Sequence, residues 1–222
     1  MIIFLFSKEL YKPSTSEKIT KVIDVRKDDE LKYISYNDGT ITKNKLWIGL
    51  CHLKETEDLG YFGYLTKNNF KVVDRKFKVS NGPAIDEKNN KLYFSDSFNS
   101  KLHQYNLKNF ERKTLIKFKK KDGFPDGIAL DNNNGLWVAH WAGAKVSRIN
   151  LKNGKIDFSI NLPALNITSV TFIGNNLNHL FVTSAKYGVT GKLLRRYPHS
   201  GSSFIIKTDY KGVKIPYTNI NF

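Results

Sequence analysis

The feature that most constrains the fold of this chain is a repeat. Four segments share a small or polar opening, a short strand, a turn, and a leucine that begins a second apolar strand. The openings lie at residues 37, 81, 126 and 169, and the leucines lie at residues 46, 92, 136 and 180. Both series advance by 43 to 46 residues, and a period of about 40–50 residues is typical of a four-stranded propeller blade. The repeat therefore predicts an all-β propeller.

The residues between the repeated strand pairs predict two outer strands per repeat. Residues 143–150 alternate between apolar and polar, turn at 152–154, and return as 155–160. No segment shows sustained helical periodicity. Residues 6–22 are typical of the last two or three strands of a further blade, and residues 203–209 of an outer strand. We therefore expect four full blades plus part of a fifth, in a single domain over residues 1–222.

The third repeat opens on Asp126, which stands between Pro125 and Gly127 just before the apolar run 128–130. A residue of fixed φ precedes this carboxylate and a residue of free φ follows it, so it is held at the mouth of a strand. Two interpretations are open. The carboxylate can be a ligand in a functional site, or Asp126 can simply cap a tight turn. The same choice applies to Asn81 before Gly82 and to Asn37 in Asn37-Asp38-Gly39.

The net charge of +16, from 36 Lys and Arg against 20 Asp and Glu, raises the question of a nucleic-acid partner. Lys outnumbers Arg 30 to 6, whereas proteins that read bases and phosphates favour Arg. The lysines are also spread along the chain. We interpret the charge as a solvated basic surface, which argues against nucleic acid as a ligand.

The cysteine count and the apolar runs indicate a compartment. Cys51 is the only cysteine, so no internal disulfide can form, which is typical of a reducing compartment. No apolar run approaches the roughly 20 residues that span a bilayer. Residues 1–6 are apolar but have no basic region before them and are shorter than a signal-peptide core, so we interpret them as a strand. We expect a cytoplasmic protein with no membrane association.

The repeated residues carry a resemblance to a known family. The chain resembles the SMP-30/gluconolactonase/regucalcin group of six-bladed propellers over residues 3 to 210. The motifs arrive in the family's order and near its spacing: Asn37-Asp38-Gly39, Leu46-Trp47-Ile48-Gly49, Ser80-Asn81-Gly82, Leu92-Tyr93-Phe94-Ser95-Asp96-Ser97, Gly123-Phe124-Pro125-Asp126-Gly127, Leu136-Trp137-Val138-Ala139-His140-Trp141-Ala142-Gly143, Val146-Ser147-Arg148, Thr168-Ser169-Val170 and Phe181-Val182-Thr183-Ser184-Ala185.

The resemblance implies a sugar lactone hydrolase that uses a divalent metal, Ca²⁺ or Zn²⁺, in the central channel. By the resemblance, Asn81 and Asp126 match metal ligands, Asp126 also matches the catalytic base, and Asn37 matches the residue that contacts the substrate. These residue types suit the chemistry. A hard cation takes amide and carboxylate oxygens, polarises the lactone carbonyl and acidifies a bound water.

Two departures from the family pattern stand out. The family's metal-binding Glu of the first blade has no counterpart, because Glu9 matches a different position, and Ser35 stands where the family usually has Arg. A site with one carboxylate holds less charge, so we expect weak metal binding. We expect a propeller that lacks its first blade, with an open edge through which the chain self-associates or takes a strand from a partner.

Three functions therefore compete at this point. The first is the metal-dependent lactonase acting on a small sugar lactone. The second is a catalytically impaired remnant or binding module, and the third is a nucleic-acid-binding propeller, which rests on charge alone. His140, Cys51 and the three tryptophans at 47, 137 and 141 are interpreted as packed residues.

Overall fold

The structure is a computed structural model, and it divides into two compact units. Unit 1 comprises Met1–Pro83 with Ile215–Phe222, and unit 2 comprises Ala84–Lys214. The structure describes residues 4–6, 9–13, 19–21, 24–27, 29–30, 32–66 and 69–215, with side chains from residue 24 onward. That residues 1–222 form one domain stays a prediction.

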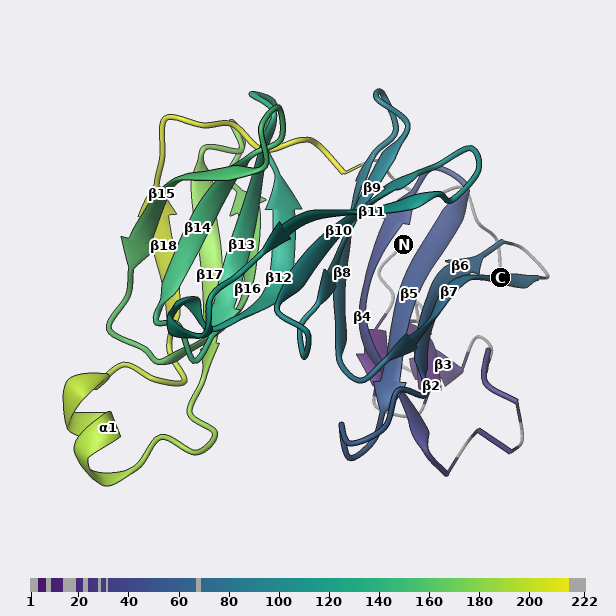
Figure 1. Cartoon of the computed structure of the whole chain (residues 1–222), viewed down its shortest axis with the longest axis horizontal. Coiled ribbons are helices and arrows are strands. Elements are labelled where there is room, and N and C mark those ends of the chain that lie inside the picture. Colours follow the sequence, from purple (N-terminus) through teal and green to yellow (C-terminus); the bar gives the residue numbers. More distant parts are fainter. Residues whose placement is uncertain are drawn as a thin grey trace. The chain divides into compact units, whose positions relative to one another are not determined.

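Unit 1 contains two antiparallel sheets whose strands follow chain order (Figure 1). A three-stranded sheet is formed by β1 (Phe4–Phe6), β2 (Glu9–Pro13) and β3 (Ile19–Lys21). A four-stranded sheet is formed by β4 (Ile34–Thr42), β5 (Lys45–His52), β6 (Gly60–Leu65) and β7 (Phe70–Phe77). The core of the second sheet consists of Ile34, Tyr36, Leu46, Ile48, Leu50, Tyr61 and Leu65, all at most 5% exposed.

The strands of unit 2 form three sheets, the first of which begins with β8 (Ser80–Asp86) at the boundary between the units. This sheet continues with β9 (Lys91–Asp96), β10 (Lys101–Asn106) and β11 (Arg112–Lys117). The second sheet contains β12 (Phe124–Leu130), β13 (Gly135–Trp141), β14 (Lys145–Asn150) and β15 (Lys155–Asn161). The third contains β16 (Asn166–Ile173), β17 (His179–Ala185) and β18 (Ser203–Lys207).

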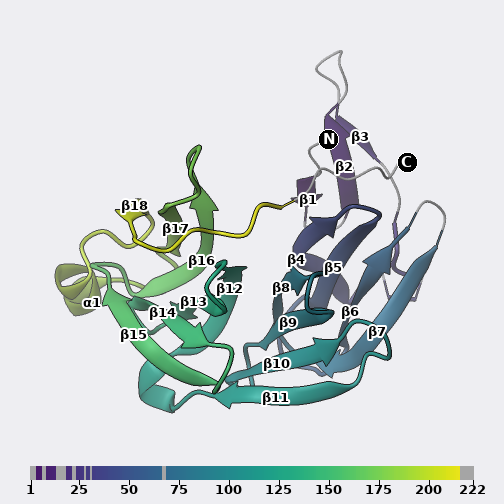
Figure 2. The same cartoon turned by 90° about the horizontal axis from the view of Figure 1, so that it is seen from above.

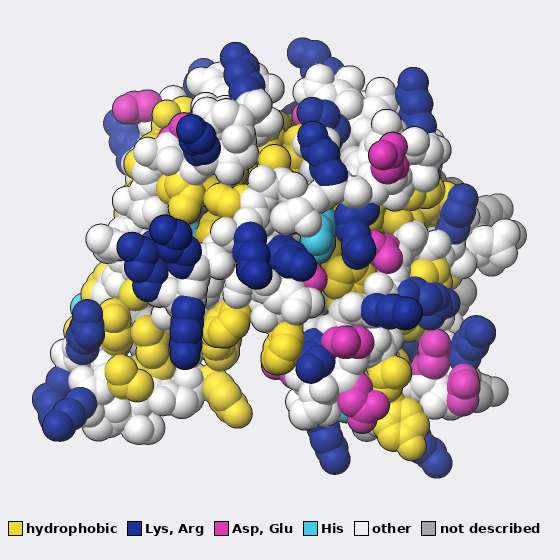
Figure 3. All heavy atoms as spheres, viewed as in Figure 1, with side chains coloured by type: hydrophobic (Ala, Val, Ile, Leu, Met, Phe, Trp, Pro, Cys, Tyr) yellow, Lys and Arg dark blue, Asp and Glu magenta, His cyan; other side chains and the backbone are white. Residues whose placement is uncertain are grey.

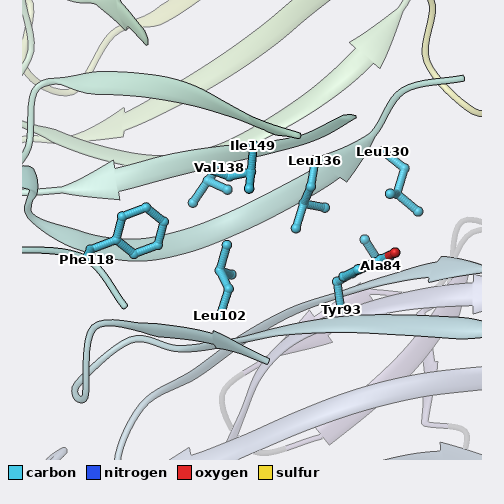
Figure 4. Packing of buried hydrophobic residues seen from close by; sticks show 8 residues of the cluster. All are labelled: Ala84, Tyr93, Leu102, Phe118, Leu130, Leu136, Val138 and Ile149. Carbon is cyan, nitrogen blue, oxygen red and sulfur yellow. The ribbon is translucent and has the colours of Figure 1, made fainter. Parts of the chain in front are cut away.

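The sheet β12–β15 is the middle layer of unit 2, with the strands β16–β18 lying along one side of it (Figure 2). Along β13, Leu136 and Val138 pack with Tyr93 and Leu102 (Figure 4). Trp137 and Ala139 point to the opposite face and join a second cluster with residues 167–182. Successive side chains of a strand point to opposite faces, so a strand covered on both faces reads as a continuous apolar run. This explains the sequence of β13.

Trp137 is held by a buried ion cluster at the turn between β12 and β13. Asp131 accepts hydrogen bonds from the indole N–H of Trp137 at 2.9 Å and from Nε and Nη2 of Arg148 at 2.7 and 3.1 Å. It also accepts from the backbone N–H groups of Asn133 and Gly135. Arg148 reaches Asp157 and lies over the ring of Tyr210 at 4.1 Å. The cluster ties three strands of one sheet together.

The predicted fold class is confirmed, and the predicted number of strands in the fourth repeat needs a correction. All four repeats form sheets, and the N-terminal segment forms the expected three-stranded sheet. Within the described residues, however, the fourth repeat has three strands, so three sheets rather than four have four strands. The short helix α1 (Gly191–Arg196) and the 3₁₀ turn Lys120–Asp122 were not predicted. No helix in the described part of the chain is long and apolar enough to cross a membrane.

Candidate functional site

The repeated openings coincide with bulges in the first strand of their sheets. In β4 the register with β5 passes from Tyr36↔Leu50 to Gly39↔Ile48, so that two residues, Asn37 and Asp38, lie opposite one. The same irregularity in β12 holds Asp126 and Gly127, and another in β16 leaves Thr168 unpaired in the register. A β-bulge turns a side chain away from the regular alternation of the strand. The fold thus presents the same backbone feature in three sheets.

In unit 1 the structure brings two predicted site residues together. The side-chain amide of Asn37 donates a hydrogen bond to Oδ1 of Asn81 at 2.8 Å and another to the carbonyl of Ser80 at 2.6 Å. Ser80 is fully buried, and its hydroxyl donates to the carbonyl of Leu50 at 3.1 Å. Asn81 is 9% exposed. These contacts fix the amide oxygen of Asn81 beside the β4 bulge.

Asp38 is a site residue that sequence reasoning missed. Its carboxylate accepts hydrogen bonds from the N–H of Gly39 at 2.7 Å and from the N–H of Gly82 at 2.8 Å. Burial raises the pKa of Asp38 above its ordinary value, and the two N–H donors oppose that shift. Asp38 therefore joins the two motifs that contain Asn37 and Asn81. An acid between Asn and Gly at a predicted repeat opening was the available signal.

In unit 2 the backbone of Asp126 is clamped from two neighbouring sheets. The hydroxyl of Ser95 in β9 donates to the carbonyl of Asp126 at 2.8 Å. On the other side, a Cβ added to Gly127 would lie 2.4 Å from Oγ and 2.8 Å from Cα of Ser169 in β16. Such a close approach needs a residue without a side chain. The openings of two repeats, at 126 and 169, thus meet here, and they set the position from which the half-buried Asp126 side chain projects.

Four of the five residues interpreted as packed, His140, Cys51, Trp47 and Trp137, are confirmed as such. His140 is fully buried and lies edge-on to Phe118 at 4.9 Å. Burial, followed by the charge of Lys145, lowers the pKa of His140 to about 4. Trp47 and Trp137 are at most 1% exposed, and Cys51 is buried with a raised thiol pKa caused mainly by burial. Trp141 is half-buried and contacts the ring of Tyr187 at 6.3 Å.

The two residues that match metal ligands lie in different units, Asn81 in unit 1 and Asp126 in unit 2, and each carries an oxygen suited to a divalent cation. Asn81 offers an amide oxygen and Asp126 a carboxylate, the oxygen ligands that Ca²⁺ takes. Across the described residues, no group of three or more His, Cys, Asp or Glu side chains could hold a metal ion. The side chain of Glu9 lies outside the described part of the chain. Ser35, at the usual Arg position of the family, is buried with its Oγ 3.7 Å from Sγ of Cys51.

Comparison with known proteins identifies the family. The sequence pattern of the SMP-30/Gluconolactonase/LRE-like region matches residues 4–186. The chain belongs to this family. It is 32% identical to an uncharacterized protein of Sulfolobus acidocaldarius over 82% of its own length, and 26% identical to the putative sugar lactone lactonase YvrE of Bacillus subtilis over 83%. It spans 66%, just under two thirds, of the length of each of these relatives.

A solved structure shows the same fold. The calcium-binding protein regucalcin from Agrobacterium tumefaciens superposes with a TM-score of 0.87, over 96% of this chain and 74% of that one, at 21% sequence identity. The resemblance stated from the sequence motifs is therefore confirmed for family and fold. At this identity the superposition carries the architecture of an SMP-30 propeller to this chain, and the roles of individual residues rest on their own geometry.

Proposed function

We propose that this SMP-30-family chain takes part in the hydrolysis of a small sugar lactone, with Asn37, Asn81 and Asp126 as the residues that face the substrate. The observation that carries the proposal is the hydrogen bond from Asn37 to Asn81 at 2.8 Å, supported on both sides by Ser80 and Asp38. Several hydrogen bonds between the two motifs orient these two amides, and such supported polar side chains are typical of binding sites. Membership of the SMP-30/Gluconolactonase/LRE-like family supports this reaction class.

A divalent cation, Ca²⁺ or Zn²⁺, would be held by Asn81 and Asp126. When bound, it would polarise the lactone carbonyl and lower the pKa of a water. Because the set contains one carboxylate, affinity should be low compared with sites of higher ligand charge. The side-chain N–H of Asn37 donates a hydrogen bond to the amide oxygen of Asn81 and so holds that oxygen in a fixed direction.

Asn37 and Asp126 supply binding and proton transfer in this proposal. The amide N–H₂ of Asn37 is used by Ser80 and Asn81, so its Oδ1 is the atom that accepts a hydrogen bond from a sugar hydroxyl. The carboxylate of Asp126 accepts the proton of the attacking water. The water oxygen bonds to the carbonyl carbon, the ring C–O bond breaks, and the proton passes to the ring oxygen to give the open hydroxy acid.

The test is the hydrolysis of glucono-δ-lactone by purified protein with added Ca²⁺ or Zn²⁺, measured as acid release in a pH-stat above the spontaneous rate. We expect Asp126→Ala to lower the enzymatic rate by at least about 10²-fold, as loss of a general base does. Glu87→Gln, an exposed acid on the same unit, is the matched control and should leave the rate unchanged.

Metal binding is measured separately by calorimetry, where Asn81→Ala should weaken the affinity for Ca²⁺. If the wild-type protein with metal is no faster than Asp126→Ala, the lactonase proposal is refuted and the impaired remnant or binding module becomes the preferred function.

A further inference from the structure

The sheet β16–β18 ends in an edge that the four-stranded sheets do not have. In the sheets β4–β7, β8–β11 and β12–β15, the third strand lies between the second and a fourth strand. In the sheet β16–β18, no fourth strand follows β18 within the described residues. Strand edges of this kind are sites for the addition of a further strand.

The third strand β18 is more exposed than the equivalent third strand β14, which has a fourth strand beside it. Through the register, Ile205 in β18 occupies the place that Arg148 has in β14, since they pair with Phe181 and Trp137 at the same point of the repeat. Arg148 is 3% exposed, whereas Ile205 is 66% exposed. A β-branched apolar side chain in the middle of an exposed strand favours pairing with a further strand.

The hydrogen-bond pattern gives the direction of the open backbone groups. The N–H of Thr208 donates to the carbonyl of Asn178 at 3.0 Å, and this pair continues the register His179↔Lys207. Hydrogen-bonded pairs alternate with non-hydrogen-bonded pairs in antiparallel strands. Ile205 and Lys207 are therefore non-hydrogen-bonded toward β17, and their N–H and C=O groups point to the open edge. No hydrogen bond found among the described residues uses these groups.

The charge around this edge has one sign. No Asp or Glu occurs from Phe158 to Thr208, while the same stretch contains five basic residues, namely Lys186, Lys192, Arg195, Arg196 and Lys207. All five are exposed, and none takes part in an ion pair found in the described part of the chain. Four of them lie in the segment 186–202 around α1, which leads directly into β18. Dark-blue side chains gather at the position of α1 in the surface view (Figure 3).

We propose that β18 binds an extended acidic segment of another polypeptide as the fourth strand of the sheet β16–β18. Backbone groups at Ile205 and Lys207 supply the hydrogen bonds, and the five basic side chains attract the acidic residues of the partner. A second copy of this chain fits less well, because pairing β18 with itself brings together two carboxylate-free sheets of chains that each carry +16. Like charges across a contact oppose association.

The experiment uses a fluorescently labelled peptide of alternating valine and glutamate, about seven residues long to match the length of an ordinary strand, and measures its binding to the full chain by anisotropy. The matched control peptide has glutamine in place of glutamate. We expect the glutamate peptide to bind at least about tenfold more tightly at low salt, with the difference shrinking as salt screens the charges. Backbone amides of Ile205 and Lys207 should become protected from hydrogen exchange when the peptide is bound.

Two variants separate edge pairing from simple charge attraction. Ile205→Pro removes the outward N–H without touching the ladder to β17, since Pro is tolerated on a strand edge, and it should weaken peptide binding by at least about tenfold. Ile205→Thr keeps the N–H and a β-branched side chain and should remain within about threefold of the wild type. Unchanged exchange protection in β17 verifies that the proline variant is folded.

Three results would overturn the proposal. They are equal binding of the glutamate and glutamine peptides, binding of the glutamate peptide that Ile205→Pro leaves unchanged, and a wild-type dimer in sedimentation that Ile205→Pro converts to a monomer, which would make a second copy the occupant. The readouts involve neither lactone nor metal, so they are independent of the proposed hydrolase function.

Discussion

Replacing Asp131 by Asn should cost unit 2 a large part of its stability. The Asp131 side chain is 0% exposed, and its two oxygens accept five hydrogen bonds, from two backbone N–H groups, one indole N–H and two guanidinium nitrogens. In the Asp131→Asn variant one of these oxygens is replaced by an N–H₂ group, which would face donors rather than acceptors. At least two hydrogen bonds are lost, and the buried Arg148 loses the anion that lies between it and Trp137.

The expected cost is about 3–5 kcal/mol, the range for removing one partner of a buried ion pair. For a unit of this size about 1 kcal/mol corresponds to about 3 °C in melting temperature, so Asp131→Asn should melt about 10–15 °C below the wild type. Differential scanning calorimetry and urea unfolding followed by tryptophan fluorescence measure the change, with Trp137 reporting on the cluster itself.

Asp157→Asn is the matched control, because Asp157 binds the same guanidinium from a side chain that is 29% exposed. Water can replace much of that contact, so we expect a cost of about 1 kcal/mol or less. The expectation is wrong if Asp131→Asn melts within about 2 °C of the wild type, or if the two variants are equally destabilised, since either result would mean that burial does not govern the strength of these pairs.

The geometry of the clamped and buried residues sets three further expectations. Gly127→Ala, whose Cβ would lie 2.8 Å from the Cα of Ser169, should lose about 1–3 kcal/mol in urea unfolding, and an unchanged unfolding midpoint would contradict the clamp. His140 has a pKa of about 4 in the folded state, against an ordinary value of 6.5, so the unfolded chain binds more protons between these pH values. The free energy of unfolding should therefore fall by about 3 kcal/mol as the solution is acidified from neutral pH to the folded-state pKa. His140→Gln should make this pH dependence less steep, and an equally steep dependence in the variant would assign it to other groups. Asp38→Asn keeps the size of the side chain but only one strong acceptor, so it should cost about 1–2 kcal/mol and expose the Gly82 amide to exchange; full protection of that amide would show that Asp38 does not hold it.

The sequence predicts the sheets well because one periodicity controls them. The strand pairs that open each repeat bury both faces of their second strand, as Leu136 and Trp137 do on opposite sides of β13. Burial on both faces requires an apolar run at this strand in every repeat. The helix α1 leaves no comparable signal, because six residues form fewer than two turns. The number of strands in the last sheet depends on which segment pairs at its edge, which local alternation cannot specify.

The candidate site was predictable as a set of positions and less so as a set of contacts. Asn37 and Asn81 are 44 residues apart, and their hydrogen bond depends on where the first strands of two repeats lie, which no spacing rule gives. Asp38 was not singled out from the sequence, because an acid before glycine looks the same whether its carboxylate faces solvent or two backbone N–H groups. Burial distinguishes the two cases, and burial is a property of the folded chain.

The repeated bulge explains why equivalent positions can hold different chemistry without changing the fold. Backbone contacts fix each opening: Gly82 is held by Asp38 in one sheet, and Asp126 is held through its carbonyl by Ser95 in another. The backbone of Asp126 is positioned by Ser95 and Ser169 of the neighbouring sheets, whereas the carboxylate of Asp38 joins the β4 bulge to Gly82. At Asp38 the carboxylate itself accepts two backbone hydrogen bonds, whereas at Asp126 the backbone carbonyl accepts one from a serine hydroxyl. Removing the Asp38 carboxylate should first lower stability, because it holds two backbone N–H groups, and under the proposed function removing the Asp126 carboxylate should first lower activity.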